Sequence, residues 1–289
     1  MSTASVQHCL ARLLVSAADR RELRADPTAV GRRFGLEPEE LATVAAIDPD
    51  RLEFTAGGVI RARLRTLRRM FRATGAIGDR GWLDRELDAF IESDIPLAAA
   101  EDSERWLAEG QRFVAWLRAR EDAYRAPHLV ELARLELLRA ELLYRPAAER
   151  ASAAADLAAG LVAQLDDVAL LTGSAVSLGA HVRLARFEYD VLSMRAGDPP
   201  PARADTRLAL ARRAGRASVA AHRLDGGTFA VVEALAGGRG PAGADAASAL
   251  RDVAALGLLT ITDLPGTGDR RAAAPAPRRS RVPSMSEGR

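Results

Sequence analysis

The chain has 289 residues with 41 basic and 39 acidic side chains, and all 41 basic ones are arginine. Hydrophobic residues make up 48%, enough for a core, and no run of about 18 uncharged apolar residues predicts a membrane span. The single cysteine, Cys9, excludes an intramolecular disulfide framework and a cysteine-cluster metal site. Since no secretion signal is recognisable either, we expect a cytoplasmic protein.

Residues 1–78 are predicted to form a domain of short helices. Asp26 followed by Pro27 is a helix N-cap with proline at the first helical position. Gly35 is typical of a helix end, and a new helix is expected to begin at Pro38, with acidic residues in its first turn. Asp48, Pro49 and Asp50 repeat the pattern of an aspartate followed by proline, so a turn and the start of the next helix are expected here.

The last helix of this first domain combines an apolar stripe with basic faces, and the segment from Thr74 to Gly78 is expected to close it. The stripe follows helical spacing: Ile60, Leu64, Leu67 and Phe71. The remaining faces carry Arg61, Arg63, Arg65, Arg68, Arg69 and Arg72. A solvated face is the favoured interpretation, and a surface for an anionic partner is the alternative.

Residues 79–165 are predicted to form a second helical domain. Two stripes indicate two helices: Leu83, Leu87, Phe90 and Ile91, then Trp106, Phe113, Val114 and Leu117. Pro127 opens a third helix whose apolar face is broad, and the alanine-rich residues 147–165 are also expected to be helical. A face this wide must be buried, either within the chain or against another protein. The residues expected to bind a partner are Leu129, Leu132 and Leu135.

Residues 166–268 are predicted to form a small α+β domain. The segment from Val168 to Val182 is expected to contain short strands or irregular structure, and a helical stretch is expected from Arg183 to Met194. Gly197 to Pro201 contains three consecutive prolines and predicts a linker or a long turn. The alternation at Leu208 and Leu210, followed by Ala214-Gly215 and Val219 to Leu224, predicts a β-hairpin.

The rest of this domain is expected to be two helices and a strand. Asp225-Gly226-Gly227 caps the first helix, the second spans Ala246 to Leu256, and Leu258 to Thr262 is the strand. The fold class is therefore mainly α, with helical domains followed by a winged-helix-like α+β domain. Residues 269–289 carry six arginines and two acids, which leaves residues 1–268 with a net charge of −2; this tail is expected to be disordered and basic.

No self-sufficient catalytic or metal-binding constellation is recognisable in the sequence. Residues 238–243 match the dinucleotide glycine pattern, but they follow a predicted helix rather than a strand. The histidines His8, His128, His181 and His222 are isolated in the sequence, and Cys9 is expected to be a buried thiol. We therefore expect a binding protein without enzymatic activity, cofactor or metal.

A winged-helix unit can place a helix in a DNA groove or add a peptide strand to a sheet edge. The second helix of the predicted unit, Asp245 to Leu256, has a net charge of −1, which opposes binding to phosphates. The peptide-binding use is therefore favoured. The residues expected to form the peptide groove are Val219, Ala220, Ala221, His222, Leu250, Val253 and Leu256.

Five segments in order give the chain a resemblance to known proteins. They are Arg21-Glu22-Leu23 through Phe34-Gly35-Leu36, Pro127 to Glu136, Phe187 to Val191, Leu224 to Phe229, and Leu256 to Leu259. Over residues 5–264 the chain resembles the partner proteins of multinuclear non-haem iron oxidative (MNIO) enzymes, which modify ribosomally made precursor peptides. It also resembles related proteins described as having a DNA-binding domain.

This resemblance implies a non-catalytic subunit with a unit similar to a RiPP recognition element. Such a unit holds the leader of the precursor peptide and presents the peptide to the iron enzyme, so a hetero-oligomer is expected and nucleic acid is not. Two alternatives remain open. One is a winged-helix transcriptional regulator; the other is a subunit of a ring-opening dioxygenase, since the first helical region is similar to the small helical subunit of those enzymes.

Overall fold

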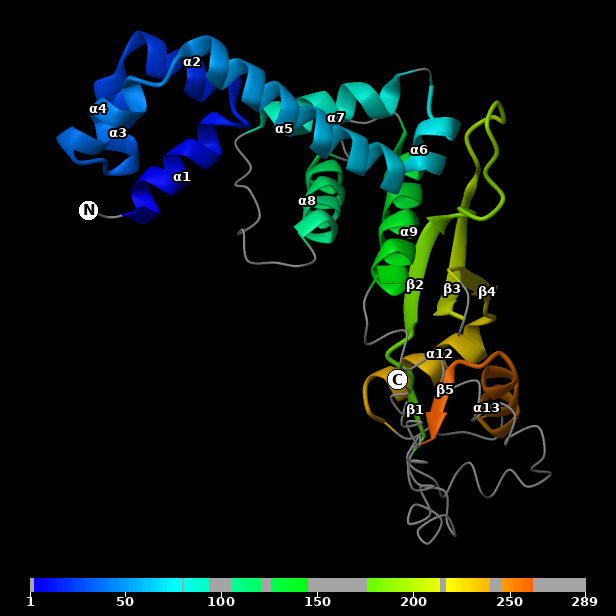
Figure 1. The fold of residues 1–289 in the computed structure, drawn as a ribbon. Helices are drawn as coiled ribbons and strands as arrows, with labels where there is room; N and C mark the ends of the chain where they lie inside the picture. Colours follow the sequence, from blue (N-terminus) through cyan, green and yellow to red (C-terminus); the bar gives the residue numbers. More distant parts are fainter. Residues whose placement is uncertain are drawn as a thin grey trace, which may run out of the picture.

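The computed structural model describes residues 3–79, 81–93, 105–120, 126–144, 176–213, 217–239 and 246–261. Over these ranges the fold is mainly helical, with a small antiparallel sheet in the C-terminal half, which confirms the predicted fold class (Figure 1). No helix in these ranges combines the length and the apolar character needed to cross a membrane.

Four short helices form the N-terminal end of the molecule: α1 (Thr3–Leu13), α2 (Ala17–Ala25), α3 (Pro27–Phe34) and α4 (Pro38–Ala45) (Figure 1). The predicted caps are confirmed. The Asp26 carboxylate accepts a hydrogen bond from the Ala29 N–H at 3.0 Å, and Gly35 ends α3 in the left-handed conformation with φ of 62°. Local sequence therefore determines where these helices begin and end.

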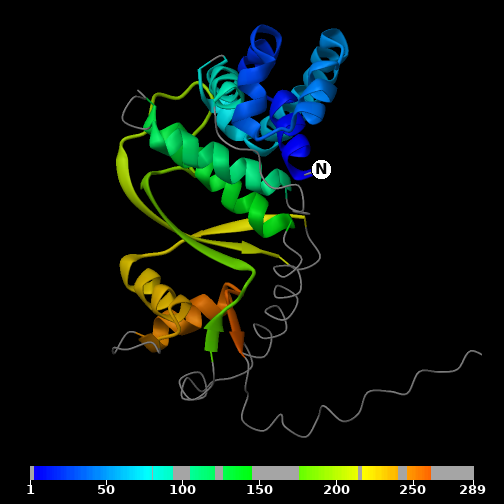
Figure 2. The same ribbon diagram turned by 90° about the vertical axis from the view of Figure 1, so that its left-hand side faces the viewer.

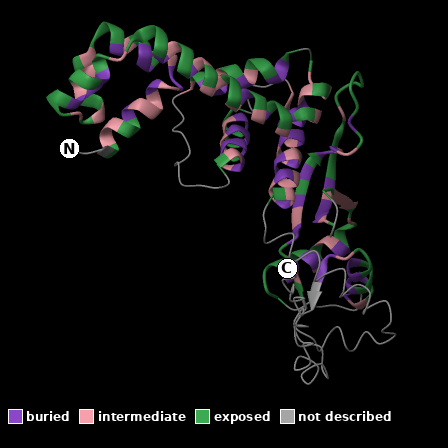
Figure 3. Ribbon diagram, in the orientation of Figure 1, coloured by how far each residue is buried: buried purple, intermediate pink, exposed green. Residues whose placement is uncertain are grey.

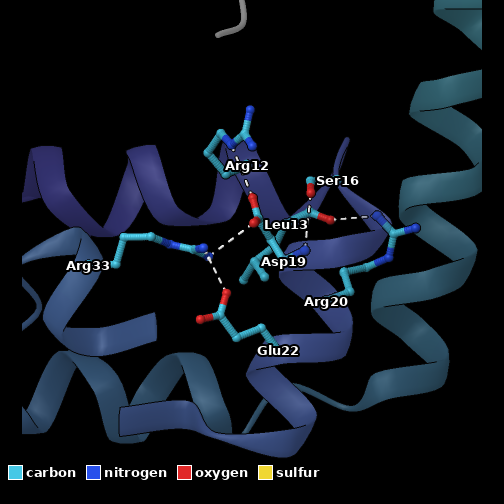
Figure 4. Close-up of polar contacts among 7 residues, drawn as sticks. All are labelled: Arg12, Leu13, Ser16, Asp19, Arg20, Glu22 and Arg33. Carbon is cyan, nitrogen blue, oxygen red and sulfur yellow. Dashed lines mark hydrogen bonds and ion pairs between the residues drawn. The ribbon is translucent and has the colours of Figure 1, made fainter. Parts of the chain in front are cut away.

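A buried carboxylate, Asp19 of α2, joins three of these helices (Figure 4). It pairs with Arg12 of α1 and Arg33 of α3, each at 3.0 Å. Ser16 caps α2 by accepting from the Asp19 N–H at 3.1 Å, and the Arg20 guanidinium donates to the Leu13 carbonyl at 2.8 Å. These ion pairs and hydrogen bonds link α1, α2 and α3 and stabilise the geometry of the bundle.

Five helices form the middle of the molecule: α5 (Pro49–Met70), α6 (Arg72–Ile77), α7 (Trp82–Glu92), α8 (Arg105–Ala119) and α9 (Pro127–Tyr144). One buried cluster draws on all of them except α6, whose Ile77 packs against it; the cluster includes Phe71, Phe90, Phe113 and Leu129. This cluster crosses the predicted domain boundary between residues 78 and 79. Buried residues are concentrated along α8, α9 and the sheet (Figure 3).

The prediction that Thr74 to Gly78 simply closes the preceding helix is wrong, because residues 72–77 form the separate helix α6. Glu136 of α9 explains this. Its carboxylate accepts from the N–H groups of Ala73 and Thr74 at 2.7 and 2.8 Å, and from the Thr74 hydroxyl at 2.7 Å. A side chain more than 60 residues away thus satisfies the first N–H groups of α6, which no local pattern could indicate.

The sheet has the strand order β2-β3-β4, formed by β2 (Val182–Tyr189), β3 (Arg203–Arg212) and β4 (Val219–Arg223), all antiparallel. Alternate residues face opposite sides. Ala185, Phe187, Leu208 and Leu210 pack against α9, whereas Val182, Ala209 and Ala211 pack against α12 (Gly226–Ala236) and α13 (Ala246–Ala255). The sheet therefore lies between α9 and the C-terminal helices (Figure 2).

The helical stretch predicted from Arg183 to Met194 is wrong, because this segment contains strand β2. Ala185, Phe187, Tyr189 and Val191 are buried, whereas Arg186 and Glu188 between them are exposed. This is a period of two, typical of a strand with one buried face. The same alternation of apolar and charged residues is present in the sequence, so the strand signal here is local.

The predicted order of hairpin, helix, helix and strand is confirmed by β3, β4, α12, α13 and β5 (Leu259–Ile261). The last strand pairs with β1 (Val176–Leu178) and not with the hairpin. The predictions for residues 147–165, 168–172 and 269–289 lie outside the described residues, as does most of the glycine pattern at 238–243.

Candidate peptide-binding edge

The predicted groove residues Val219, Ala220, Ala221 and His222 form strand β4. All four are half-buried, and β4 pairs with β3 on one side. Val219 and Ala221 pack towards α9, so Ala220 and His222 point to the opposite face. The structure thus brings these four residues together on β4, which is an edge strand of the sheet within the described chain.

The register of the hairpin identifies which backbone groups of β4 face outward. The Leu224 N–H donates to the Arg207 carbonyl at 3.0 Å, and the Arg213 N–H donates to the Ser218 carbonyl at 3.4 Å. Alternation in an antiparallel ladder then directs the backbone groups of even-numbered β4 residues towards β3. The N–H and C=O groups of Val219, Ala221 and Arg223 therefore point away from the sheet. No residue within the described ranges forms a hydrogen bond with them.

The C-terminal end of the opposite edge of the sheet, along β2, is occupied by side chains of α9. The Glu131 carboxylate accepts from the N–H groups of Glu188 and Tyr189 at 2.7 and 3.2 Å, beside a register shift in β2. Arg134 donates to the Arg186 carbonyl at 2.9 Å. These contacts block the addition of a strand to β2 at its C-terminal end, which leaves β4 as the better edge for a peptide.

Burial raises the pKa of Glu131, although the two backbone N–H groups that donate to its carboxylate oppose this shift. A raised pKa means that the folded protein holds the proton more tightly than the unfolded chain does. The contribution of Glu131 to stability is therefore fully present below its ordinary pKa of 4.5 and is lost as the pH rises through the raised value.

Glu131→Gln removes this titration. We expect the free energy of unfolding of the wild type, minus that of Glu131→Gln, to decrease between pH 4 and pH 7. Urea denaturation of both proteins at constant ionic strength measures this difference in the free energy of unfolding. Glu92→Gln, which neutralises an exposed carboxylate on α7, is the control and should show no such trend. A difference that grows with pH would contradict the role assigned to burial.

The other predicted groove residues do not line an open groove. Leu250 and Val253 have no exposed surface, because they pack against Val182, Ala209 and Ala211 and hold α13 on the sheet. Leu256 is 37% exposed at the end of α13. The assignment of Leu250 and Val253 to a peptide groove is corrected accordingly: a peptide could contact them only by displacing the core.

The predicted partner-binding residues are also core residues. Leu129, Leu132 and Leu135 are 3%, 3% and 1% exposed. Leu129 belongs to the helical cluster, whereas Leu132 and Leu135 pack against the sheet. The broad apolar face of α9 is thus buried within the chain, between the helices and the sheet, and these three side chains are not available to another protein.

His181 and Cys9 are both buried in the packed interior of the protein. His181 is buried and its Nε2 lies 2.8 Å from the Gly257 carbonyl, which joins the start of β2 to the end of α13. Cys9 is fully buried, as predicted, and burial raises the pKa of its thiol. Over the ranges that the structure describes, no group of three or more histidine, cysteine or acidic residues is placed to hold a metal ion.

No protein-family model matches the chain, and a search of the curated proteins found no significant match.

Proposed function

We propose that the protein is a non-catalytic partner subunit that binds a ribosomal precursor peptide and presents it to an iron-dependent peptide-modifying oxidase in the cytoplasm. The observation that carries the proposal is the outer edge of β4, which pairs with no other strand within the described residues. Three N–H and three C=O groups, from Val219, Ala221 and Arg223, point outward without partners in the described chain. An extended peptide can pair with such an edge through main-chain hydrogen bonds.

The surroundings of β4 favour a peptide as the ligand. Val219 and Ala221 lie on the side of α9, and Ala220 and His222 lie on the other face, so alternate side chains of an added strand would meet two different surfaces. Main-chain pairing provides affinity, and these two surfaces provide the selectivity. The resemblance to partners of MNIO enzymes supports the choice of a precursor leader as that peptide.

The charge on α13 argues against the alternative, a DNA-binding regulator. This is the helix that a winged-helix protein would place in the groove, and its exposed face carries Arg251 and Asp252, whose charges cancel. A helix without excess positive charge gains little from the phosphates of DNA. The basic face of α5 is partly neutralised too, since Arg63 pairs with Glu109 and Arg68 with Asp84, both at 2.7 Å.

Two measurements test the proposal. The protein is co-expressed with an iron-dependent peptide-modifying oxidase of the MNIO class, sought among the genes that neighbour its own, and complex formation is followed by size-exclusion chromatography. Fluorescence anisotropy then measures binding of the labelled precursor peptide. We expect a stable complex and saturable peptide binding. The absence of both would overturn the proposal, and a salt-dependent shift of operator DNA would favour the regulator instead.

A further inference from the structure

A pocket of 640 Å³ lies between α5, α8 and α9, and its described lining includes no residue of β4. Its volume falls within the range of about 300–1,000 Å³ that is usual for small-ligand sites. Arg65 and Arg69 line it from α5, Trp106 from α8, and Glu136, Arg139 and Tyr144 from α9. These residues combine positive charge with aromatic surface.

The pocket has more positive charge than its own acid can neutralise. Arg65 and Arg69 are one helical turn apart, so both guanidinium groups reach the same side of α5. Within the described chain, neither pairs with an acidic residue. Glu136 is the acidic residue among the lining residues, and its carboxylate already accepts three hydrogen bonds from Ala73 and Thr74. Three guanidinium groups therefore face one engaged carboxylate.

Arg139 is the most informative of the three arginines. Its side chain is half-buried, and its Nε is fully buried with no hydrogen-bond partner in the described chain. Burial lowers the pKa of Arg139, while the nearby Glu136 opposes the shift. An arginine nevertheless stays protonated at neutral pH, and buried donors in proteins are normally satisfied. The Arg139 side chain also lines the pocket, so its guanidinium adds a third positive charge to those of Arg65 and Arg69.

The aromatic side of the pocket is provided by Trp106 and Tyr144. Their rings pack edge to face with centroids 4.4 Å apart, and Tyr144 remains 58% exposed. An exposed aromatic surface beside three guanidinium groups suits a ligand that carries an anionic group next to an apolar or aromatic one.

We propose that this pocket binds an oxyanion, a carboxylate or a phosphate, attached to an apolar or aromatic group. Arginine side chains recognise both anions through paired N–H donors, which fits the three guanidinium groups of Arg65, Arg69 and Arg139. Arg139 anchors the anion, and Trp106 with Tyr144 contacts its apolar neighbour.

Two sources can supply this chemistry, a small organic anion or an acidic residue of a bound peptide. The acidic peptide residue as a source rests on the proposed function. The position of the hairpin supports it, because β4 begins near the end of α9 that lines the pocket. Arg212, which is paired with Val219, donates hydrogen bonds to the carbonyls of Leu142 at 3.3 Å and of Leu143. The first residue of β4 thus lies near the end of α9 that contributes Tyr144 to the pocket.

Calorimetric titration of the full chain tests the pocket with two probes, phenyl phosphate and N-acetyl-Glu-Phe-amide; benzyl alcohol and the Gln-Phe analogue serve as uncharged controls. We expect Arg139→Gln, and the double variant Arg65→Gln/Arg69→Gln, to weaken binding at least about tenfold. The matched control Arg61→Gln/Arg72→Gln removes the same two charges from exposed positions outside the pocket lining. It should change binding less than about twofold.

The outcomes separate the two sources. Tighter binding of phenyl phosphate supports a small-molecule ligand, and tighter binding of the Glu-Phe probe supports an acidic peptide residue. Binding of neither probe, or equal loss in the control variant, overturns the proposal. Arg65 and Arg69 are exposed, so their double variant gives a result even if Arg139→Gln alters folding. Because phenyl phosphate does not require β4, failure of the peptide proposal would leave its binding unchanged.

Discussion

Replacing Ala221 by proline is expected to weaken binding of the precursor peptide by at least about tenfold, equivalent to about 1.4 kcal/mol, while the protein stays folded. Proline lacks the N–H group that an added strand would use, and its ring occupies the space beside the edge. The Ala221 N–H points away from β3, so no hydrogen bond of the sheet is lost. Fluorescence anisotropy measures the affinity, and thermal unfolding followed by circular dichroism measures the stability.

Ala220→Pro is the matched control for this prediction. It introduces the same ring one residue earlier, where the N–H faces β3 and belongs to the ladder. We expect it to destabilise the hairpin, by on the order of 1–3 kcal/mol for the unsatisfied carbonyl alone. If Ala221→Pro binds the precursor peptide as tightly as the wild type, the peptide does not add to β4 and the proposed binding mode is wrong.

Leu135→Ala is expected to lower the free energy of unfolding by about 2–5 kcal/mol, a large part of the roughly 5–15 kcal/mol that is typical of a folded domain. Leu135 is 1% exposed and packs in the cluster that joins α9 to Phe187 and Leu208 of the sheet. Truncation leaves a cavity that the close-packed surroundings fill only partly. Urea denaturation measures the loss.

Phe54→Ala is the control, because it removes a larger apolar side chain that is 80% exposed on α5. We expect it to change stability by less than about 0.5 kcal/mol. The comparison also decides between two roles for the α9 face. A Leu135→Ala protein of unchanged stability that no longer binds the oxidase would make this residue part of an interface and contradict its place in the core.

The hairpin and the helix ends could be predicted because their signals are local. Asp26, Gly35 and Asp225 act on backbone groups within a few residues, and the Asp225 carboxylate accepts from the Thr228 N–H at 2.9 Å as the sequence suggests. Strand β2 replaces the helix predicted from Arg183 to Met194, although its alternation of apolar and charged residues is a local signal too. Helix α6 could not have been found, since its N-terminal partner is Glu136.

For the two candidate binding sites, too, the sequence indicates some residues and only the tertiary structure shows how they are arranged. The residues of β4 were identified from the hairpin pattern, but only the register shows that Val219, Ala221 and Arg223 present their backbone groups outward. The spacing of Arg65 and Arg69 places them on one helix face, yet nothing in the sequence brings Arg139 to the same pocket. Convergence of residues from three helices is a property of packing.

The sequence by itself therefore determined the helical class, the caps, the hairpin and the width of the apolar face on α9. Only the tertiary structure decided what covers that face. An apolar stripe specifies that a side chain must leave water and does not specify which surface receives it. Leu129, Leu132 and Leu135 are covered by the chain's own helices and sheet. Burial is non-directional, so a core and an interface have the same sequence pattern, and tertiary packing distinguishes them.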